Sequence, residues 1–249
     1  MTDWPQLINA PITEALLDIR VQLPDTTNSS HLKAMHERIK EQYPTCQLRQ
    51  SFETSVEFSK DAKPLHSTSI GEDGYLFLSS DEKQVIQARL DGFSFSRLKP
   101  YESWKKLQDE SRRLWKIYIE ATKPERLTRL SVRYIDLIEL PLPFSDFHEW
   151  ILTVPEIAPT LPQGLAGYLM RMVIPFDDTG TTAIVTQNLG PSRERPVNSV
   201  SLIFDIDVFR SVDLNGNSEE AWGHFEELRE IKNRIFFESI TRKTEALLK

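Results

Sequence analysis

The sequence predicts an α+β protein of two similar β-α-β-β-β-α halves, residues 1–124 and 125–249. Three observations predict this class. Each half contains several segments in which apolar and polar residues alternate, as in half-buried strands. Each half also ends in a long amphipathic helical pattern. Finally, the two helical patterns can be aligned with each other.

The first half opens on a strand, because residues 14–23 place apolar side chains at every second position. Turn residues after Pro24 then introduce a helix at 31–43, which Pro44 ends. The remaining elements expected in this half are strands at 47–59, 74–80 and 83–98, the last bulged at Gly92, and a long helix at 101–122.

The second half repeats this order. A strand at 129–140 precedes a proline break and a short helix around 144–152. Three more strands are expected at 167–176, 181–189 and 198–209. Ser218 is the expected cap of a second long helix, which runs nearly to the C-terminus.

The two long helices align at a constant offset of 118 residues. This alignment pairs Trp104 with Trp222 and Ile117 with Ile235, and it places Asn233 opposite Trp115. We therefore expect an internal duplication, although amphipathic helices also share aromatic, Arg and Glu residues by chance.

An antiparallel sheet with one apolar face needs a cover, which a long amphipathic helix supplies. We expect the two sheets to join edge to edge into one curved sheet with both long helices on the same side. A concave face then remains opposite the helices. The order of elements resembles the duplicated TATA-binding-protein-like or helix-grip class, and such a fold carries no function by itself.

The composition bounds the possible functions. A net charge of −7 over 249 residues argues against a general polyanion binder, which needs clustered Lys and Arg. The single cysteine, Cys46, excludes an intramolecular disulfide. The N-terminus lacks the pattern of a signal peptide, and no segment is apolar enough to span a bilayer. We expect a cytoplasmic protein.

Asp205 and Asp207 are the strongest candidates for a metal site. Their spacing of two places both carboxylates on one face of a strand, within reach of one divalent cation. Alternatively, the two acids lie on a solvated strand face whose opposite side is apolar.

Five further residues are candidates for ligand binding. Arg20 and Arg133 occupy matched positions in the two halves, where paired guanidinium groups would suit a carboxylate or phosphate, or would offset nearby acids. Asp136 shares a predicted strand face with apolar residues, so its carboxylate must be hydrogen-bonded or lie at the rim of the sheet. Lys232 and Asn233 mark where the second long helix departs from the first.

Motifs for nucleophilic catalysis, zinc or phosphate binding are missing from the sequence, so we assign no catalytic residue and expect no cofactor. Basic residues of the first long helix, such as Lys105 and Arg112, alternate with acids on a face opposite the apolar residues. This pattern is typical of a solvated helix face rather than a nucleic-acid interface.

Five blocks of the sequence carry a resemblance to a known family: NAPITEALLDI, GFSFSRLKPYESW, RLSVRYIDLIELP, FDIDVF and KNRIFFESIT. The chain resembles a sporadically distributed bacterial protein family of about this length, and the resemblance covers nearly the whole chain. It implies a bacterial source. Because no catalytic residues are assigned in that family, it implies no reaction.

From these observations we expect a binding or regulatory interaction protein of the bacterial cytosol with a protein partner. The first alternative is a metal-dependent enzyme that acts on a phosphate-containing ligand through Asp205 and Asp207. The second alternative is a nucleic-acid-binding module. Nothing in the sequence excludes a homo-oligomer.

Overall fold

The computed structural model describes residues 4–5, 7–57, 65–191 and 198–249. Within this part of the chain, the strands form one nine-stranded antiparallel sheet in the order β2-β3-β4-β5-β1-β6-β9-β8-β7. The strands are β1 (Ile12–Gln22), β2 (Thr45–Glu57), β3 (Leu65–Leu78), β4 (Gln84–Arg89), β5 (Gly92–Leu98), β6 (Arg126–Pro141), β7 (Tyr168–Phe176), β8 (Thr181–Pro191) and β9 (Ser199–Asn215). The helices are α1 (Ser29–Glu37), α2 (Trp104–Thr122), η1 (Phe147–Glu149, a 3-10 turn), α3 (Glu220–Ser239) and α4 (Arg242–Leu248).

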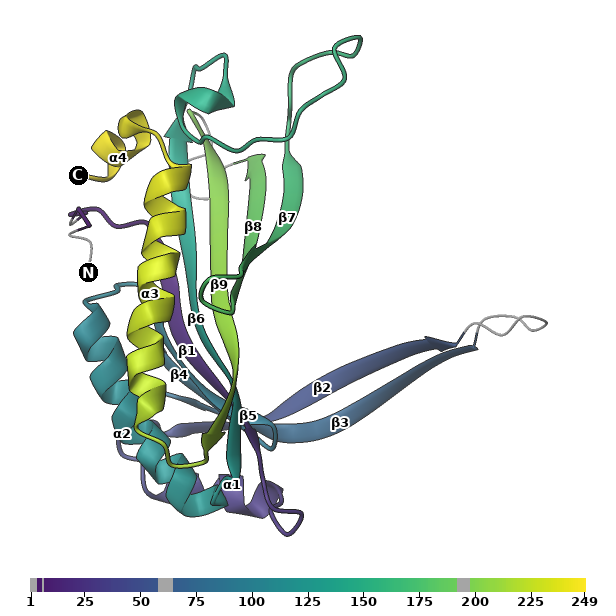
Figure 1. Cartoon of the computed structure of the whole chain (residues 1–249), viewed down its shortest axis with the longest axis vertical. Helices are drawn as coiled ribbons and strands as arrows, with labels where there is room; N and C mark the ends of the chain where they lie inside the picture. Colours follow the sequence, from purple (N-terminus) through teal and green to yellow (C-terminus); the bar gives the residue numbers. More distant parts are fainter. Residues whose placement is uncertain (1–3, 6, 58–64, 192–197) are drawn as a thin grey trace.

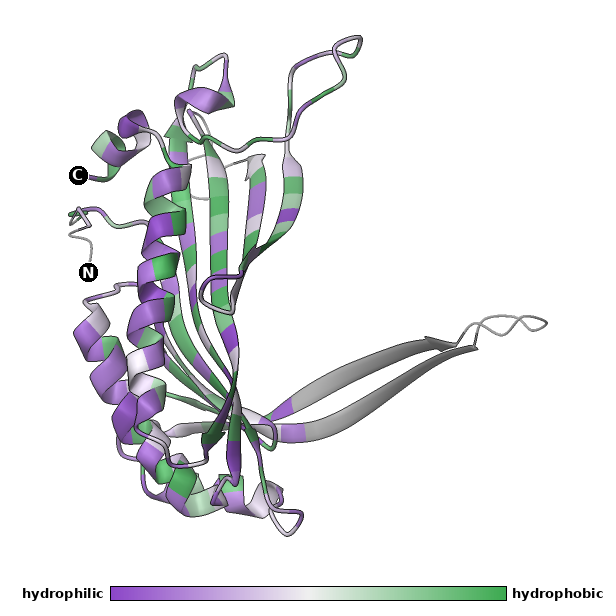
Figure 2. Ribbon diagram, in the orientation of Figure 1, coloured by the Kyte–Doolittle hydropathy of each residue, from purple (hydrophilic) through white to green (hydrophobic). Residues whose placement is uncertain are grey.

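The strands β1 and β6 join the two halves at the middle of the sheet. In their register Leu17 lies opposite Val132 and Ile19 opposite Leu130, and all four side chains are buried. Alternation along both strands turns these residues to one face and polar residues to the other, as Figure 2 also shows along β6 and β9. The expected single sheet is confirmed.

The helices α1, α2 and α3 cover one face of this sheet (Figure 1). α2 packs on β5 and β1, where Phe93, Trp115 and Tyr118 form a cluster with ring centroids 5.1 to 5.7 Å apart. α3 packs on β6 and β9. The ring centroids of Phe236 on α3 and Phe204 on β9 are 6.1 Å apart. Each such side chain contributes about 1.5 to 3 kcal/mol through its burial. We call the uncovered side the helix-free face.

The prediction of one strand at 83–98 was wrong. The segment forms two strands, β4 and β5, joined by a tight turn that pairs Arg89 with Gly92, so the first half has four strands after α1 instead of three. Gly92 does not mark a bulge. A Cβ atom there would lie 2.4 Å from the carbonyl oxygen of Ile19, so glycine allows β5 to approach β1 closely.

The second long helix is also shorter than predicted. It ends at Ser239, because Ile240 adopts an extended conformation, is buried and bridges to Ile151. A separate short helix, α4, then begins after Thr241, which caps it. The N-cap position of α3 is held by Glu219 rather than by Ser218.

Two smaller helices also differ from prediction. α1 is limited to Ser29–Glu37, and the helix expected at 144–152 is only the 3-10 turn η1. The hairpin of β2 and β3 is longer than expected and extends away from the helices (Figure 1). None of the described helices is long and apolar enough to cross a membrane.

Candidate functional site

Arg20 and Arg133 both lie on the helix-free face, as the strand alternation predicts. Arg20 pairs with Asp18, at 3.3 Å, and with Asp91. Arg133 binds the Asp205 carboxylate with two nitrogens, at 2.8 and 2.6 Å, and this hydrogen bonding raises the pKa of the guanidinium. The strand register separates the two arginines by four residues along the sheet, or roughly 13 Å. They therefore do not form a joint anion clamp.

Asp205 and Asp207 also share the helix-free face, and each is paired with an arginine. Asp207 lies 3.2 Å from a guanidinium nitrogen of Arg129 and accepts a hydrogen bond from the Ser131 hydroxyl. Among the residues that the structure describes, no group of three or more His, Cys, Asp or Glu side chains is placed to hold a metal ion. A cation between the two aspartates would have to displace the arginines that already balance their charges.

A buried ion pair near the centre of the sheet connects to the Arg129–Asp207 pair. Arg89 is 4 % exposed and donates to Asp18 at 2.6 Å, while Arg129 lies 3.5 Å from the same carboxylate. A row of charged side chains thus runs from Asp91 through Arg89, Asp18 and Arg129 to Asp207. Sequence reasoning missed Arg89 and Arg129, because alternation gives the face of a strand residue but not its neighbours.

The other three predicted ligand residues lie on the opposite, helix-covered face. Asp136 of β6 and Lys232 and Asn233 of α3 are each at most 7 % exposed. The Lys232 ammonium lies 3.9 Å from the centroid of the Tyr134 ring, a cation–π contact, and the Tyr134 hydroxyl is 2.9 Å from that of Tyr101. The predicted ligand set is therefore divided between the two faces of the sheet.

Burial shifts the pKa values of Asp136 and Lys232 toward each other. Burial raises the pKa of Asp136 to about 7, although the nearby Lys232 charge opposes the shift. Burial also lowers the pKa of Lys232 to about 8. Within the described part of the chain, the Oδ2 atom of Asp136 has no hydrogen-bond partner. Because both groups are enclosed by the core, their charges bear on the stability of the fold.

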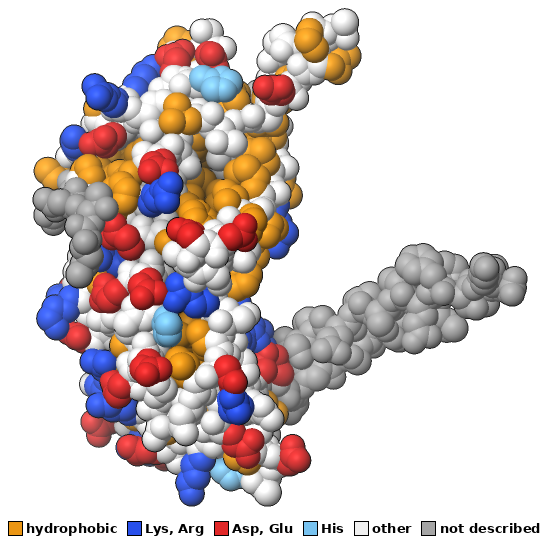
Figure 3. Space-filling model, viewed as in Figure 1, with side chains coloured by type: hydrophobic (Ala, Val, Ile, Leu, Met, Phe, Trp, Pro, Cys, Tyr) orange, Lys and Arg blue, Asp and Glu red, His pale blue; other side chains and the backbone are white. Residues whose placement is uncertain are grey.

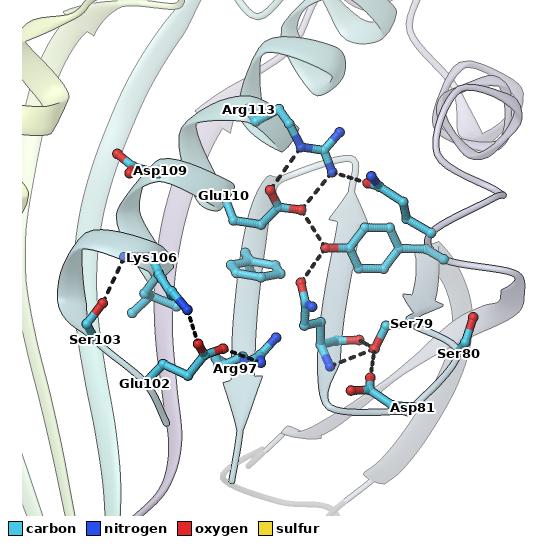
Figure 4. Close-up of a pocket in the computed structure, with 15 residues that line it drawn as sticks. Ser79, Ser80, Asp81, Arg97, Glu102, Ser103, Lys106, Asp109, Glu110 and Arg113 are labelled. Carbon is cyan, nitrogen blue, oxygen red and sulfur yellow. Dashed lines mark hydrogen bonds and ion pairs between the residues drawn. The ribbon is translucent and has the colours of Figure 1, made fainter. Parts of the chain in front are cut away.

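A separate pocket of about 740 Å³ lies between α2, the end of β3 and the strands β4 and β5 (Figure 4). On one side, Arg113, Glu110, Tyr43 and Gln84 form a hydrogen-bonded chain. Burial raises the pKa of Glu110, but hydrogen bonds from Arg113 and Tyr43 outweigh burial and hold that pKa below its ordinary value. On the other side, Glu102 pairs with both Arg97 and Lys106.

The seven charged side chains that line the pocket are each bound by another side chain. Asp109 pairs with Lys105, and Asp81 accepts from the Ser79 hydroxyl. The charged side chains of the pocket therefore already have hydrogen-bond or ion-pair partners within the protein. Sequence reasoning missed it, because its lining comes from several segments that carry no local motif.

Apolar side chains form a further feature of the helix-free face, over the second half of the sheet. Leu169 is 73 % exposed, Val173 56 % and Ile203 38 %. The register places Leu137, Ile203, Asn188 and Leu169 in one row across β6, β9, β8 and β7. Val173 lies opposite Ile184 on β8. We call Leu137, Leu169, Val173, Ile184 and Ile203 the apolar strip.

The chain matches no protein-family model, no curated protein and no solved structure.

Proposed function

We propose that this chain is a non-enzymatic binding protein of the bacterial cytoplasm, and that a protein partner docks on the apolar strip. The observation that carries the proposal is the exposure of Leu169, Val173 and Ile203 on one sheet face. The solvated face of an antiparallel sheet is ordinarily polar. Clustered exposed apolar residues are typical of a surface that a partner covers.

Polar groups lie within the apolar strip as well as beside it. The row formed by Asp205, Thr186 and the exposed Arg171 separates Val173 and Ile184 from Leu137, Ile203 and Leu169. Protein–protein interfaces commonly combine apolar side chains with polar and charged ones. The exposed thiol of Cys46, the only cysteine, fits a reducing compartment.

We also infer that the two halves arose by duplication and then diverged in function. The strand order β1-β5-β4-β3 of the first half corresponds to β6-β9-β8-β7 of the second, which leaves β2 as an addition. On the helix-free face both halves carry ion pairs, such as Asp18–Arg20 and Arg133–Asp205, and the second half carries the apolar strip in addition. This difference supports a binding role for the second half.

A capture experiment tests the proposal. The tagged chain and its Ile203→Glu variant are used as baits in an extract of the native host. We expect the wild-type chain to recover a specific protein and Ile203→Glu to lose most of it, because the new carboxylate would be buried at the interface without a partner. Quantitative mass spectrometry of the recovered proteins measures the difference.

Leu152→Glu is the matched control. Leu152 is 55 % exposed, but it lies beside the end of α3, where its N–H donates to the Ser239 carbonyl. We expect this variant to recover the same protein as the wild type. Equal recovery by Ile203→Glu, or no specific protein with any bait, would contradict the proposal.

A further inference from the structure

The strand β7 forms one edge of the sheet, and its outward backbone groups can be assigned from Pro175. In the described part of the chain, β7 pairs only with β8. Proline has no N–H, so its nitrogen must face away from the ladder. Backbone groups alternate in direction along a strand. The backbone N–H and C=O groups of Leu169, Arg171 and Val173 therefore point outward, away from β8. The C=O group of Pro175 points outward too.

The side chains of β7 make this edge apolar on both faces. Leu169 and Val173 are exposed on the helix-free face. On the other face, Tyr168, Met170, Met172, Ile174 and Phe176 are only half-buried, because α3 covers β6 and β9 and does not reach this edge. Figure 3 shows hydrophobic side chains exposed over this part of the sheet, beside α3. A long apolar edge is ordinarily avoided because it pairs with other strands.

Charged residues and proline on an edge strand oppose pairing with other strands. In β7 this protection is limited to Arg171 and Pro175.

The β7 sequence is complementary to itself in one antiparallel register. If a two-fold axis passes through Met172, the half-buried face pairs Tyr168 with Phe176 and Met170 with Ile174 of a second copy, and Met172 with itself. Aromatic and aliphatic pairs of this kind stabilise neighbouring strands. The half-buried apolar face thus continues without a polar interruption from one copy to the other.

The backbone supports the same register. Arg171 of one copy lies opposite Val173 of the other, and these two residues exchange both of their outward hydrogen bonds. The Leu169 N–H then donates to the Pro175 carbonyl. An axis at Arg171 would place two arginines directly opposite each other, which is unfavourable. An axis at Val173 would move Leu169 past the end of the partner strand.

We propose that this chain forms a two-fold symmetric dimer through β7, in which antiparallel pairing about Met172 continues the sheet from one copy into the next. The dimer shares Leu169 and Val173 with the apolar strip, but its tests measure the association of the chain with itself and need no other protein. We identify the strand that pairs with β7 as β7 of a second copy. One register both pairs the apolar side chains and requires no N–H group from Pro175.

Cysteine cross-linking tests the register. In a Cys46→Ser background, Met172→Cys places two thiols in a non-hydrogen-bonded pair with Cα atoms about 4.5 Å apart, which is within disulfide range. We expect mild oxidation to convert most of this variant into a covalent dimer. Met170→Cys is the matched control. Position 170 lies opposite position 174 of the second copy, so the two introduced cysteines are four residues apart along the strands, roughly 13 Å. It should remain largely uncross-linked.

Sedimentation of the unmodified chain and of two edge variants tests the backbone contribution. Val173→Pro removes an outward N–H without removing a bond to β8, whereas Val173→Ala shortens the side chain and keeps the N–H. We expect dimers for the wild type and Val173→Ala, and monomers for Val173→Pro. A monomeric wild-type chain, or equal cross-linking of the two cysteine variants, would overturn the proposal.

Discussion

Replacing Lys232 with methionine is expected to lower the free energy of unfolding by about 1 to 3 kcal/mol at pH 8. The substitution keeps much of the side-chain volume but leaves the Asp136 carboxylate in the core without its cation. Asp136 is 2 % exposed, and its Oδ2 atom finds no hydrogen-bond partner among the described residues. Urea unfolding of the wild type and the variant at pH 8 measures the loss.

Two control variants separate the effect of the buried charge from that of removing any charge on α3. Arg234→Met removes an exposed charge from the same helix, where the ion pair with Glu238 lies in solvent, and should change stability by less than about 1 kcal/mol. Combining Lys232→Met with Asp136→Leu removes both buried charges and should recover most of the loss. If Lys232→Met alone is as stable as the wild type, the two groups are not coupled through the core.

The contribution of Asp136 to stability is expected to fall as the pH rises from about 4 to about 7, and Asp136→Asn should remove this contribution. Burial raises the pKa of Asp136 from 3.8 to about 7 in the folded state. The folded state therefore holds this proton more tightly than the unfolded chain does. The resulting stabilisation is complete below the unfolded pKa and is lost as the pH rises through the folded one.

The size of this effect follows from linkage. A tenfold difference in proton affinity between the folded and unfolded states corresponds to about 1.4 kcal/mol, so the Asp136 contribution across this window is on the order of a few kcal/mol. Thermal unfolding of the wild type and of Asp136→Asn at pH 5 and pH 8 gives the comparison. We expect the wild type to lose more stability than the variant between the two values. Equal losses would show that Asp136 titrates as it does in the unfolded chain.

Much of the sheet could be predicted from alternation, because burial of one face imposes a period of two on each strand. The face of Asp136 was placed correctly, beside Val132 and Tyr134. The split of 83–98 into β4 and β5 was missed, because the change of phase between Ala88 and Phe93 was interpreted as a bulge at Gly92 and not as a turn. The extension of β3 to Leu65 was missed as well, because residues 65–73 are largely polar.

The candidate sites were harder to predict than the fold, because they depend on contacts between distant segments. Arg89 and Asp18 are 71 residues apart, and only the β1–β5 and β4–β5 registers bring them together. The division of the predicted ligand residues between two faces has the same origin. The apolar strip combines side chains from four strands, whose order in the sheet differs from their order in the chain.

The affinity of the captured partner for two variants tests the binding role of the apolar strip most directly. The partner recovered with the wild-type chain is purified and titrated against wild type, Ile203→Glu and Leu152→Glu. We expect Kd to rise at least about tenfold for Ile203→Glu, since burying an isoleucine side chain contributes about 1.5 to 3 kcal/mol, and to stay within about twofold for Leu152→Glu. An unchanged Kd for Ile203→Glu would contradict docking on the apolar strip.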